Sequence, residues 1–187
     1  MLETERLLLR RWTDADRAPF AAMNDDPEVM EFFPKRLTRA EADALVDRVE
    51  QSFENEGFGL WAVERRDTGE FIGFTGLLRV RHDIPVRGEV EVGWRLARAA
   101  WGRGFASEAA RASLDYGFGT AGLDAIMSMT AVVNVRSRAV MERIGMRYDP
   151  ASDFDHTSVP VGHVLRPHIV YRIGPALMGT YAGGEES

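Results

Sequence analysis

The order of apolar and polar positions predicts short strands and amphipathic helices in the first 80 residues. An apolar run at 7–9 predicts a strand, and the two helical periods that follow begin after Thr13 and Thr38, a residue type that caps helices well. Two further runs, at 58–65 and 71–80, flank a turn that contains glycine. We expect a β-hairpin there.

The second half of the chain predicts a crossover between strands. Residues 89–96 alternate strictly, which predicts a strand with two different faces. One face carries Val90, Val92, Trp94 and Leu96, and the other carries Glu89, Glu91, Gly93 and Arg95. Helices at 105–118 and 135–144 and strands at 125–133 and 169–173 follow. The order predicts an α+β fold with a mixed, mostly antiparallel sheet flanked by helices.

Length and composition indicate one globular domain. Of the 187 residues, 45% are apolar and 28% are charged, so we expect a single domain over 1–182 and a flexible tail over 183–187. No apolar run is long enough to cross a bilayer, and the N-terminus lacks the basic and apolar regions of a signal peptide. We therefore expect a cytoplasmic protein without a membrane partner.

The absence of cysteine removes several kinds of chemistry. The sequence allows no disulfide, no thiolate nucleophile and no cysteine-containing metal site. Three of the four histidines, His156, His163 and His168, lie close together, but their spacing matches no metal motif, so no metal is expected. The net charge of −6 disfavours nonspecific binding to nucleic acid, and no such partner is expected.

Charge is unevenly placed along the chain. Residues 13–57 hold twelve acidic and five basic side chains, whereas residues 95–143 hold seven arginines and four acids. The first region would suit a cationic ligand and the second an anion. Ordinary solvated helix faces would give similar counts, and the charge alone does not separate the two interpretations.

A glycine-rich turn, Trp101-Gly102-Arg103-Gly104-Phe105-Ala106-Ser107, leads directly into the helix expected at 105–118. The first amides of a helix lack partners and lie at the positive end of its dipole, so the turn is a candidate site for a phosphate or pyrophosphate. The same glycines would also serve a tight strand-to-helix connection. The turn matches neither the Walker A motif nor the dinucleotide-binding glycine pattern.

Three ordered blocks resemble the GNAT superfamily of acyl-CoA-dependent N-acetyltransferases: Glu91 to Leu96, Trp101 to Ala109, and Asn134 to Met146. The segments 4–10, 26–30 and 154–168 resemble the branch that contains the RimJ and RimL ribosomal-protein acetyltransferases. The likeness covers nearly the whole chain.

The resemblance implies acetyl-CoA as cosubstrate. In this fold the strand ending near Leu96 and the strand starting near Ile126 splay apart, with the pantetheine arm between them. The pyrophosphate is expected on the amides of 102–107, and Arg98 is expected to supply charge because Trp101 replaces the family's usual Gln or Arg. The implied cofactor-binding residues are Val92, Trp94, Leu96, Arg98, Trp101, Gly102, Arg103, Gly104, Phe105, Ala106, Ser107, Asn134 and Ser137.

The resemblance also implies Glu91 as the base that removes the proton of the attacking amine. Glu89, on the same strand face, is the first alternative. The loop histidines His82 and His163 are the others, because imidazole titrates near neutral pH.

Two hydrogen donors to the reacting thioester are expected. A backbone N–H near Gly93 or Trp94 would stabilise the oxyanion. Many family members protonate the departing thiolate with a Tyr, but this chain carries Met141 at that position, so Ser137 or a water near Asn134 becomes the candidate. Asn134 and Ser137 are also residue types that cap helices.

The expected activity is transfer of an acetyl group from acetyl-CoA to a primary amine. The acidic region at 13–57 would face the acceptor, which favours a protein N-terminus, such as that of a ribosomal protein, or a small cationic amine. A catalytically silent acyl-CoA-binding module and a nucleotide-binding α/β domain are the alternatives. The sequence leaves open whether the protein is a monomer or a homodimer.

Overall fold

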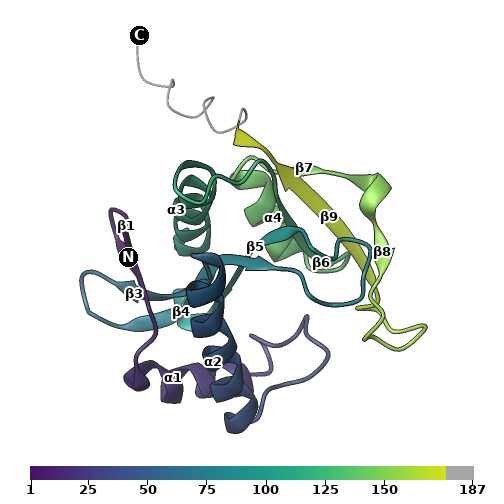
Figure 1. Ribbon diagram of the computed structural model, residues 1–187. Coiled ribbons are helices and arrows are strands. Elements are labelled where there is room, and N and C mark those ends of the chain that lie inside the picture. Colours follow the sequence, from purple (N-terminus) through teal and green to yellow (C-terminus); the bar gives the residue numbers. More distant parts are fainter. Residues whose placement is uncertain (176–187) are drawn as a thin grey trace.

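The described part of the chain, residues 1–175 of a computed structural model, is built around one nine-stranded sheet (Figure 1). The strand order is β1-β2-β3-β4-β5-β6-β9-β7, and β8 pairs with β9. The strands are β1 (Leu2–Glu3), β2 (Leu7–Arg10), β3 (Leu60–Arg65), β4 (Phe71–Arg79), β5 (Val90–Leu96), β6 (Ile126–Ala131), β7 (Arg147–Tyr148), β8 (Phe154–Asp155) and β9 (Pro167–Ile173). The helices are α1 (Asp14–Asp25), α2 (Arg39–Glu56), α3 (Phe105–Gly119) and α4 (Val135–Arg143), with 3-10 turns at Arg98–Ala100 and Pro150–Ser152. The tail expected at 183–187 lies outside the described residues.

The elements predicted in the first 80 residues are confirmed, because their local signals act as expected. Capping boxes at Thr13 and Thr38 start α1 and α2, and the Glu41 N–H donates to the Thr38 hydroxyl at 3.3 Å. Helix α2 ends where Gly57 adopts a left-handed φ of 76°. Strands β1, β7 and β8 were not predicted, because two residues each are too few to show a period.

Strands β5 and β6 are the only parallel neighbours among residues 1–175. Their ladder holds the single pair Glu91↔Met127, whereas β5 pairs with β4 along its whole length. Beyond Glu91, the edge of β5 that faces β6 therefore has backbone groups without a strand partner. The mixed, mostly antiparallel sheet that the sequence predicted is confirmed, and so is the splay that the family resemblance implied.

Register divides the sheet into two faces. Arg95, Gly93 and Glu91 of β5 lie on the same side as Phe74 of β4, which packs against Phe20 of α1 with ring centroids 5.9 Å apart. We call this side the α1 face. In Figure 1 the helices α1 and α2 lie toward the bottom of the view, and α3 and α4 lie toward the top.

Helix α3 lies close against the opposite side, the α3 face. Gly117 has no room for a side chain, because a Cβ there would lie 2.6 Å from Ile126 Cδ1 and 2.9 Å from Leu77 Cδ1. Leu77 pairs with Val92 of β5, so both belong to this face. The small-residue stripe predicted for α3 thus brings the helix next to both β4 and β6.

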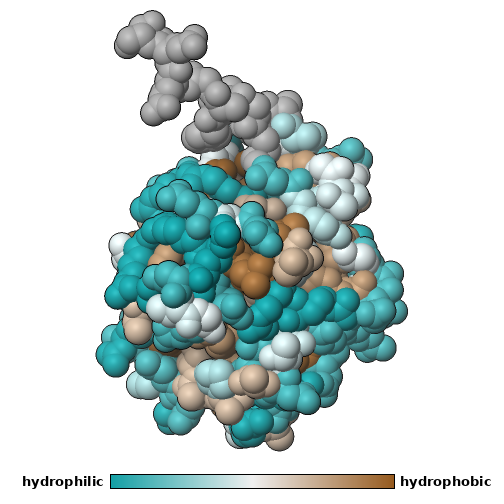
Figure 2. Space-filling view, turned by 90° about the vertical axis from the view of Figure 1, so that its left-hand side faces the viewer, coloured by the Kyte–Doolittle hydropathy of each residue, from teal (hydrophilic) through white to brown (hydrophobic). Residues whose placement is uncertain are grey.

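One face of the molecule is drawn with its residue hydropathy in Figure 2. Figure 2 shows one hydrophilic face on which hydrophobic side chains gather near the centre. Within residues 1–175, none of the helices combines the length and the apolar character that crossing a bilayer requires.

Gly117→Val should lower the free energy of unfolding by about 1–3 kcal/mol, because its methyl groups would meet Ile126 and Leu77 in a packed interior. Urea unfolding followed by circular dichroism measures the change. Gly119→Ala in the same helix is the control, since a Cβ there meets nothing within 4 Å. The control should be neutral or gain up to about 1 kcal/mol, because alanine favours helix. Equal losses in both variants would show that α3 does not depend on this close approach.

Candidate active site

The glycine-rich turn and the first turn of α3 form a backbone surface suited to an anion. Gly102 and Gly104 adopt left-handed φ values of 73° and 79°, which residues with side chains rarely adopt. Gly104 is also the N-cap of α3, so the first amides of α3 receive no side-chain cap. Helices α2 and α4 differ, because Thr38 and Asn134 cap them. The amides on which the sequence predicts a pyrophosphate are thus free of a capping side chain.

Three arginines lie around this turn, and two of them were not selected from the sequence. Arg103 lies in the turn and is exposed. Arg143 reaches from α4, and its Nη1 donates to Ser107 Oγ at 3.3 Å. Arg6 Nη1 donates to the Arg103 carbonyl at 2.9 Å. Arg6 and Arg143 lie far from the turn in sequence, so no local signal marks them.

Arg98 and Trp101, the two candidates just before the turn, hold the connection in place. Arg98 forms ion pairs with Asp26, at 3.7 Å, and with Glu28. Trp101 Nε1 donates to the Leu96 carbonyl at 2.8 Å. The charge that the resemblance expected from Arg98 is therefore matched by acids of the protein itself.

Arg136 of α4 packs over Trp101, at the start of the glycine-rich turn. Its guanidinium carbon lies 4.4 Å from the Trp101 ring centroid, and it pairs with Glu31. Beyond the ends of β5 and β6, this contact links α4 to the glycine turn. A cavity of about 590 Å³ opens beside it, lined by Glu31, Phe32, Val133, Val135, Arg136, His163, Val164 and Leu165.

The cofactor-binding residues expected on β5 turn their backbone, and not their side chains, toward the gap between β5 and β6. Val92 and Leu96 are 0% and 5% exposed and pack in the core, while Trp94 is partly buried. In the first turn of α3 the same holds for Phe105, Ala106 and Ser107, which are buried or partly buried. A ligand between the strands would therefore meet mainly the main chain.

Glu91 is a partly buried carboxylate at the site. It lies on the α1 face at the pair where β5 and β6 meet. Burial raises its pKa to about 7, although the backbone N–H of Met129 opposes the shift. No cation among the described residues pairs with it. A carboxyl group with this pKa changes its charge near neutral pH, which is the requirement for a general base.

Glu89, the alternative base, is held by a cation. Arg172 of β9 donates from Nη2 to Glu89 Oε1 at 3.0 Å and from Nε to Asp149 Oδ2 at 2.8 Å. Glu89 therefore has an ionic partner, which Glu91 lacks among the described residues. Two carboxylates that share a face in the sequence pattern thus have different environments.

Asn134 and Ser137 form the start of α4. Asn134 Oδ1 accepts from the Ser137 N–H at 3.1 Å, and its Nδ2 donates to Thr130 Oγ1 at 2.9 Å and to Ser137 Oγ at 3.1 Å. Because Ser137 Oγ accepts this bond, its own O–H is left to donate elsewhere. Met141, further along α4, is 1% exposed and packs in the core.

The histidines lie in two places. The rings of His156 and His168 have centroids 4.9 Å apart, and His82 lies 6.3 Å from His156. Burial lowers the pKa of both His156 and His168. His163 lines the cavity beside Arg136, and its Nδ1 accepts from the Leu165 N–H at 3.1 Å. In the described chain no group of three or more His, Asp or Glu side chains is arranged to hold a metal ion.

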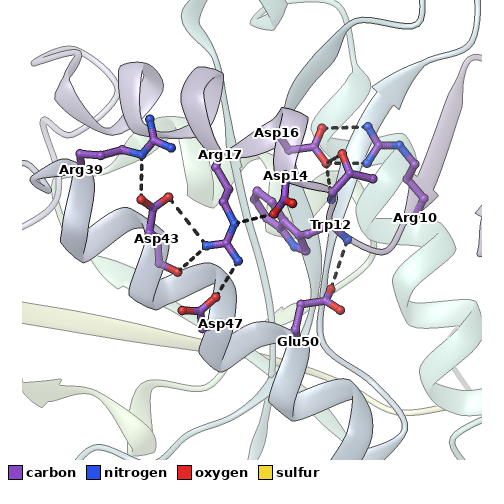
Figure 3. A network of polar contacts seen from close by, with 10 residues as sticks. Arg10, Trp12, Asp14, Asp16, Arg17, Arg39, Asp43, Asp47 and Glu50 are labelled. Carbon is purple, nitrogen blue, oxygen red and sulfur yellow. Dashed lines mark hydrogen bonds and ion pairs between the residues drawn. The ribbon is translucent and has the colours of Figure 1, made fainter.

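The acidic helices are neutralised by arginines and a lysine. Each of the twelve acids in 13–57 forms an ion pair. Figure 3 shows Arg17 reaching Asp14, Asp43 and Asp47, while Arg39 also pairs with Asp43. Six of the partners come from outside the segment: Arg10, Arg11, Arg79, Arg81, Arg98 and Arg136. The acidic composition therefore leaves little unmatched charge to attract a cation.

These features fit an acyl-CoA. The unpaired edge of β5 suits an extended arm that carries amides. The uncapped amides of α3, with Arg103 and Arg143 beside them, suit a pyrophosphate.

Known proteins share both the sequence pattern and the fold. Residues 6–147 match the acetyltransferase (GNAT) domain family. YkkB of Bacillus subtilis is 35% identical over 148 residues, which cover 79% of this chain and 85% of YkkB. The N-acetyltransferase YoaA of the same organism is 30% identical over 151 residues, covering 79% of this chain and 82% of YoaA.

Solved structures of acetyltransferases have a similar fold. A crystal structure of an acetyltransferase from Agrobacterium tumefaciens is 30% identical, superposes with a TM-score of 0.76 and covers 92% of each chain. RimJ of Mycobacterium smegmatis, in complex with CoA-disulfide, is similar in fold, with a TM-score of 0.72, 19% identity and coverage of 91% of this chain and 82% of RimJ. The chain therefore belongs to the GNAT family and is an acetyl-CoA-dependent N-acetyltransferase.

Proposed function

We propose that this enzyme transfers the acetyl group to a primary amine by direct attack, with Glu91 as general base. The observation that carries the proposal is the position of Glu91, desolvated on the α1 face with a pKa of about 7, at the point where β5 and β6 separate. Bound acetyl-CoA supplies the reactive thioester. The proposed cofactor-binding residues are Val92, Trp94, Leu96, Arg98, Trp101, Gly102, Arg103, Gly104, Phe105, Ala106, Ser107, Asn134 and Ser137, together with Arg143.

Two side chains and one backbone amide share the chemistry. Glu91 takes the proton that the amine loses as its nitrogen bonds to the acetyl carbon. Ser137 Oγ gives a proton to the sulfur, which leaves with the electrons of the broken C–S bond. A backbone N–H of Gly93 or Trp94 donates to the carbonyl oxygen as it gains negative charge. Pairing of β4 with β5 is continuous at Gly93, so this amide lies in a regular strand and not in a bulge.

The acceptor belongs to the amines predicted from the sequence, a protein N-terminus or a small amine. A place in the RimJ/RimL-like branch is part of the proposal, and it rests on the segments 4–10, 26–30 and 154–168. A cytoplasmic location is also part of the proposal. The paired acids of α1 and α2 reduce the support for a cationic acceptor that composition alone had given.

Acetyl-CoA should raise the melting temperature, because a ligand that binds only the folded state adds about 2.7 kcal/mol at ~100 times its Kd. Arg103→Glu should weaken this binding about tenfold or more, since it places an anion beside the pyrophosphate. Arg48→Glu is the charge-matched control, because Arg48 is exposed on α2. A shift with NAD or ATP but none with acetyl-CoA would contradict the assigned cofactor surface.

Glu91→Gln should lower kcat/KM by about 10²–10⁴-fold when the pH lies between about 7 and the pKa of the acceptor amine. Below this range the wild-type carboxyl group is already protonated. Above it the amine is already neutral, so the loss should shrink at both ends. Steady-state rates across the pH range, with acetyl-CoA affinity checked separately, measure the profile.

Glu89→Gln is the matched control and should change the rate little, because Glu89 pairs with Arg172. A large loss in Glu89→Gln with none in Glu91→Gln would show that the wrong carboxylate has been chosen.

The pH dependence of the unfolding free energy tests the environment of Glu91 independently of the rate. Because burial raises the pKa of Glu91 from 4.5 to about 7, the folded state loses stability as pH rises from about 4.5 to about 7, and Glu91→Gln should remove that loss in urea unfolding.

Ser137→Ala should lower kcat by no more than about tenfold, because a thiolate with a pKa near ~8.5 needs little proton assistance at neutral pH. Rates measured at saturating acetyl-CoA isolate this step from binding. A loss of ~10⁴-fold would instead make Ser137 an obligatory acid.

A further inference from the structure

Arg95 is a cation without a counter-charge on the α1 face of β5. Its Nη1 donates to Asn24 Oδ1, and its Nε is inaccessible to solvent and has no hydrogen-bond partner within the described residues. The guanidinium carbon lies 3.9 Å from the ring centroid of Phe33 and 5.4 Å from that of Phe74. No carboxylate in residues 1–175 forms an ion pair with it.

Apart from Arg138, the other partly buried arginines among the described residues have acidic partners. Arg10, for example, pairs with Asp16 and Glu64 at 2.7 Å each. Arg95 has only the neutral Asn24, and desolvation lowers its pKa to about 10. A desolvated charge without a partner costs free energy, and an anionic ligand would offset that cost.

A cavity of about 450 Å³ lies at Arg95, lined by Met30, Phe33, Pro34, Lys35, Leu37, Arg95 and Ser158. Its polar members are two cations and one hydroxyl, and no acid lines it. The remaining walls are apolar. This lining suits a small molecule with one anionic end and disfavours a polyamine, whose cations would meet the unpaired guanidinium of Arg95.

The strand face joins this cavity to Glu91. Arg95 and Glu91 are four residues apart on the same side of β5, so their Cα atoms are separated by about 13 Å. Gly93 lies between them, and a Cβ built there meets nothing within 4 Å. The strand face is therefore open between the carboxylate of Glu91 and the guanidinium of Arg95.

We propose that the acceptor is a primary amine that also carries a carboxylate, which binds Arg95 while the amine reaches Glu91. The substrate class is amino acids and short peptides with a free C-terminus. Ser158 also lines the cavity and offers a hydroxyl, whereas Lys35 is paired with Glu41. This inference rests on the proposed function for the place of the amine, and on Arg95 and its cavity for the carboxylate.

The first test compares acceptors that differ only at the C-terminus. Wild-type enzyme with acetyl-CoA is given glycine peptides of increasing length as free acids and as amides, with spermidine as a cationic amine. The free acids should have kcat/KM values about tenfold to a hundredfold higher than the amides, mainly through KM. Equal values for acid and amide, or a preference for spermidine, would overturn the proposal.

The second test removes the guanidinium. Arg95→Gln should abolish the difference in kcat/KM between acid and amide, and Arg95→Lys, which keeps the charge, should retain part of the difference. Arg48→Gln is the matched control, because Arg48 is exposed on α2. Undiminished discrimination in Arg95→Gln contradicts the assignment, and if this variant does not fold, the wild-type comparison decides.

A binding measurement separates the carboxylate site from the base. With CoA present, N-acetyltriglycine should raise the melting temperature of the wild type more than its amide does, and the difference should vanish in Arg95→Gln. Selective binding of the acid without acetylation of any amine would refute the proposed function and leave the carboxylate site standing. Acetylation of acids and amides alike, with no selective binding, would refute the carboxylate site alone.

Discussion

The single backbone pair between β5 and β6, Glu91↔Met127, is the constraint on which the rest of the site depends. Parallel strands end at the same edge of a sheet, so the segments that follow β5 and β6 meet there: the glycine turn with α3, and α4. One pair keeps the sheet continuous, and its divergence beyond that point leaves main-chain groups for a ligand. Gly117 then keeps α3 close to β4 and β6.

Charge is distributed in two ways in this molecule. Charges that hold elements together are paired, as in the network between α1 and α2 in Figure 3. Glu91 and Arg95 have no ionic partner among the described residues. Desolvation raises the pKa of Glu91 and lowers the pKa of Arg95, which favours the neutral form of each. Both lie on one strand face, on either side of Gly93. Ionisable groups with shifted pKa values and no ionic partner are typical of sites that bind or transform a ligand.

The first turn of α4 combines structural and chemical roles. Asn134 caps the helix and orients the Ser137 hydroxyl through one amide group. Arg136 and Arg143, on the same short helix, reach Trp101 and Ser107 on the other side of the opening. Met141 anchors the helix in the core. A change in the packing of α4 would therefore move hydrogen donors and cations together.

Local signals in the sequence determined most of the elements and their order. Thr13, Thr38 and Gly57 act through neighbours within a few residues, and the alternation of β5 needs only its own residues, so these features could be predicted. The glycine turn was visible for the same reason. Two-residue strands carry no period and escaped prediction.

Only the tertiary structure decided which charged groups are free. Glu89 is held by Arg172, 83 residues away, and Arg98 by Glu28, 70 residues away, whereas Glu91 and Arg95 meet no such partner in the described chain. Alternation placed Glu89, Glu91 and Arg95 on one face but could not rank them. Ion pairing and desolvation depend on which distant segments meet, and this information lies in the packing of the whole fold rather than in the spacing of neighbouring residues.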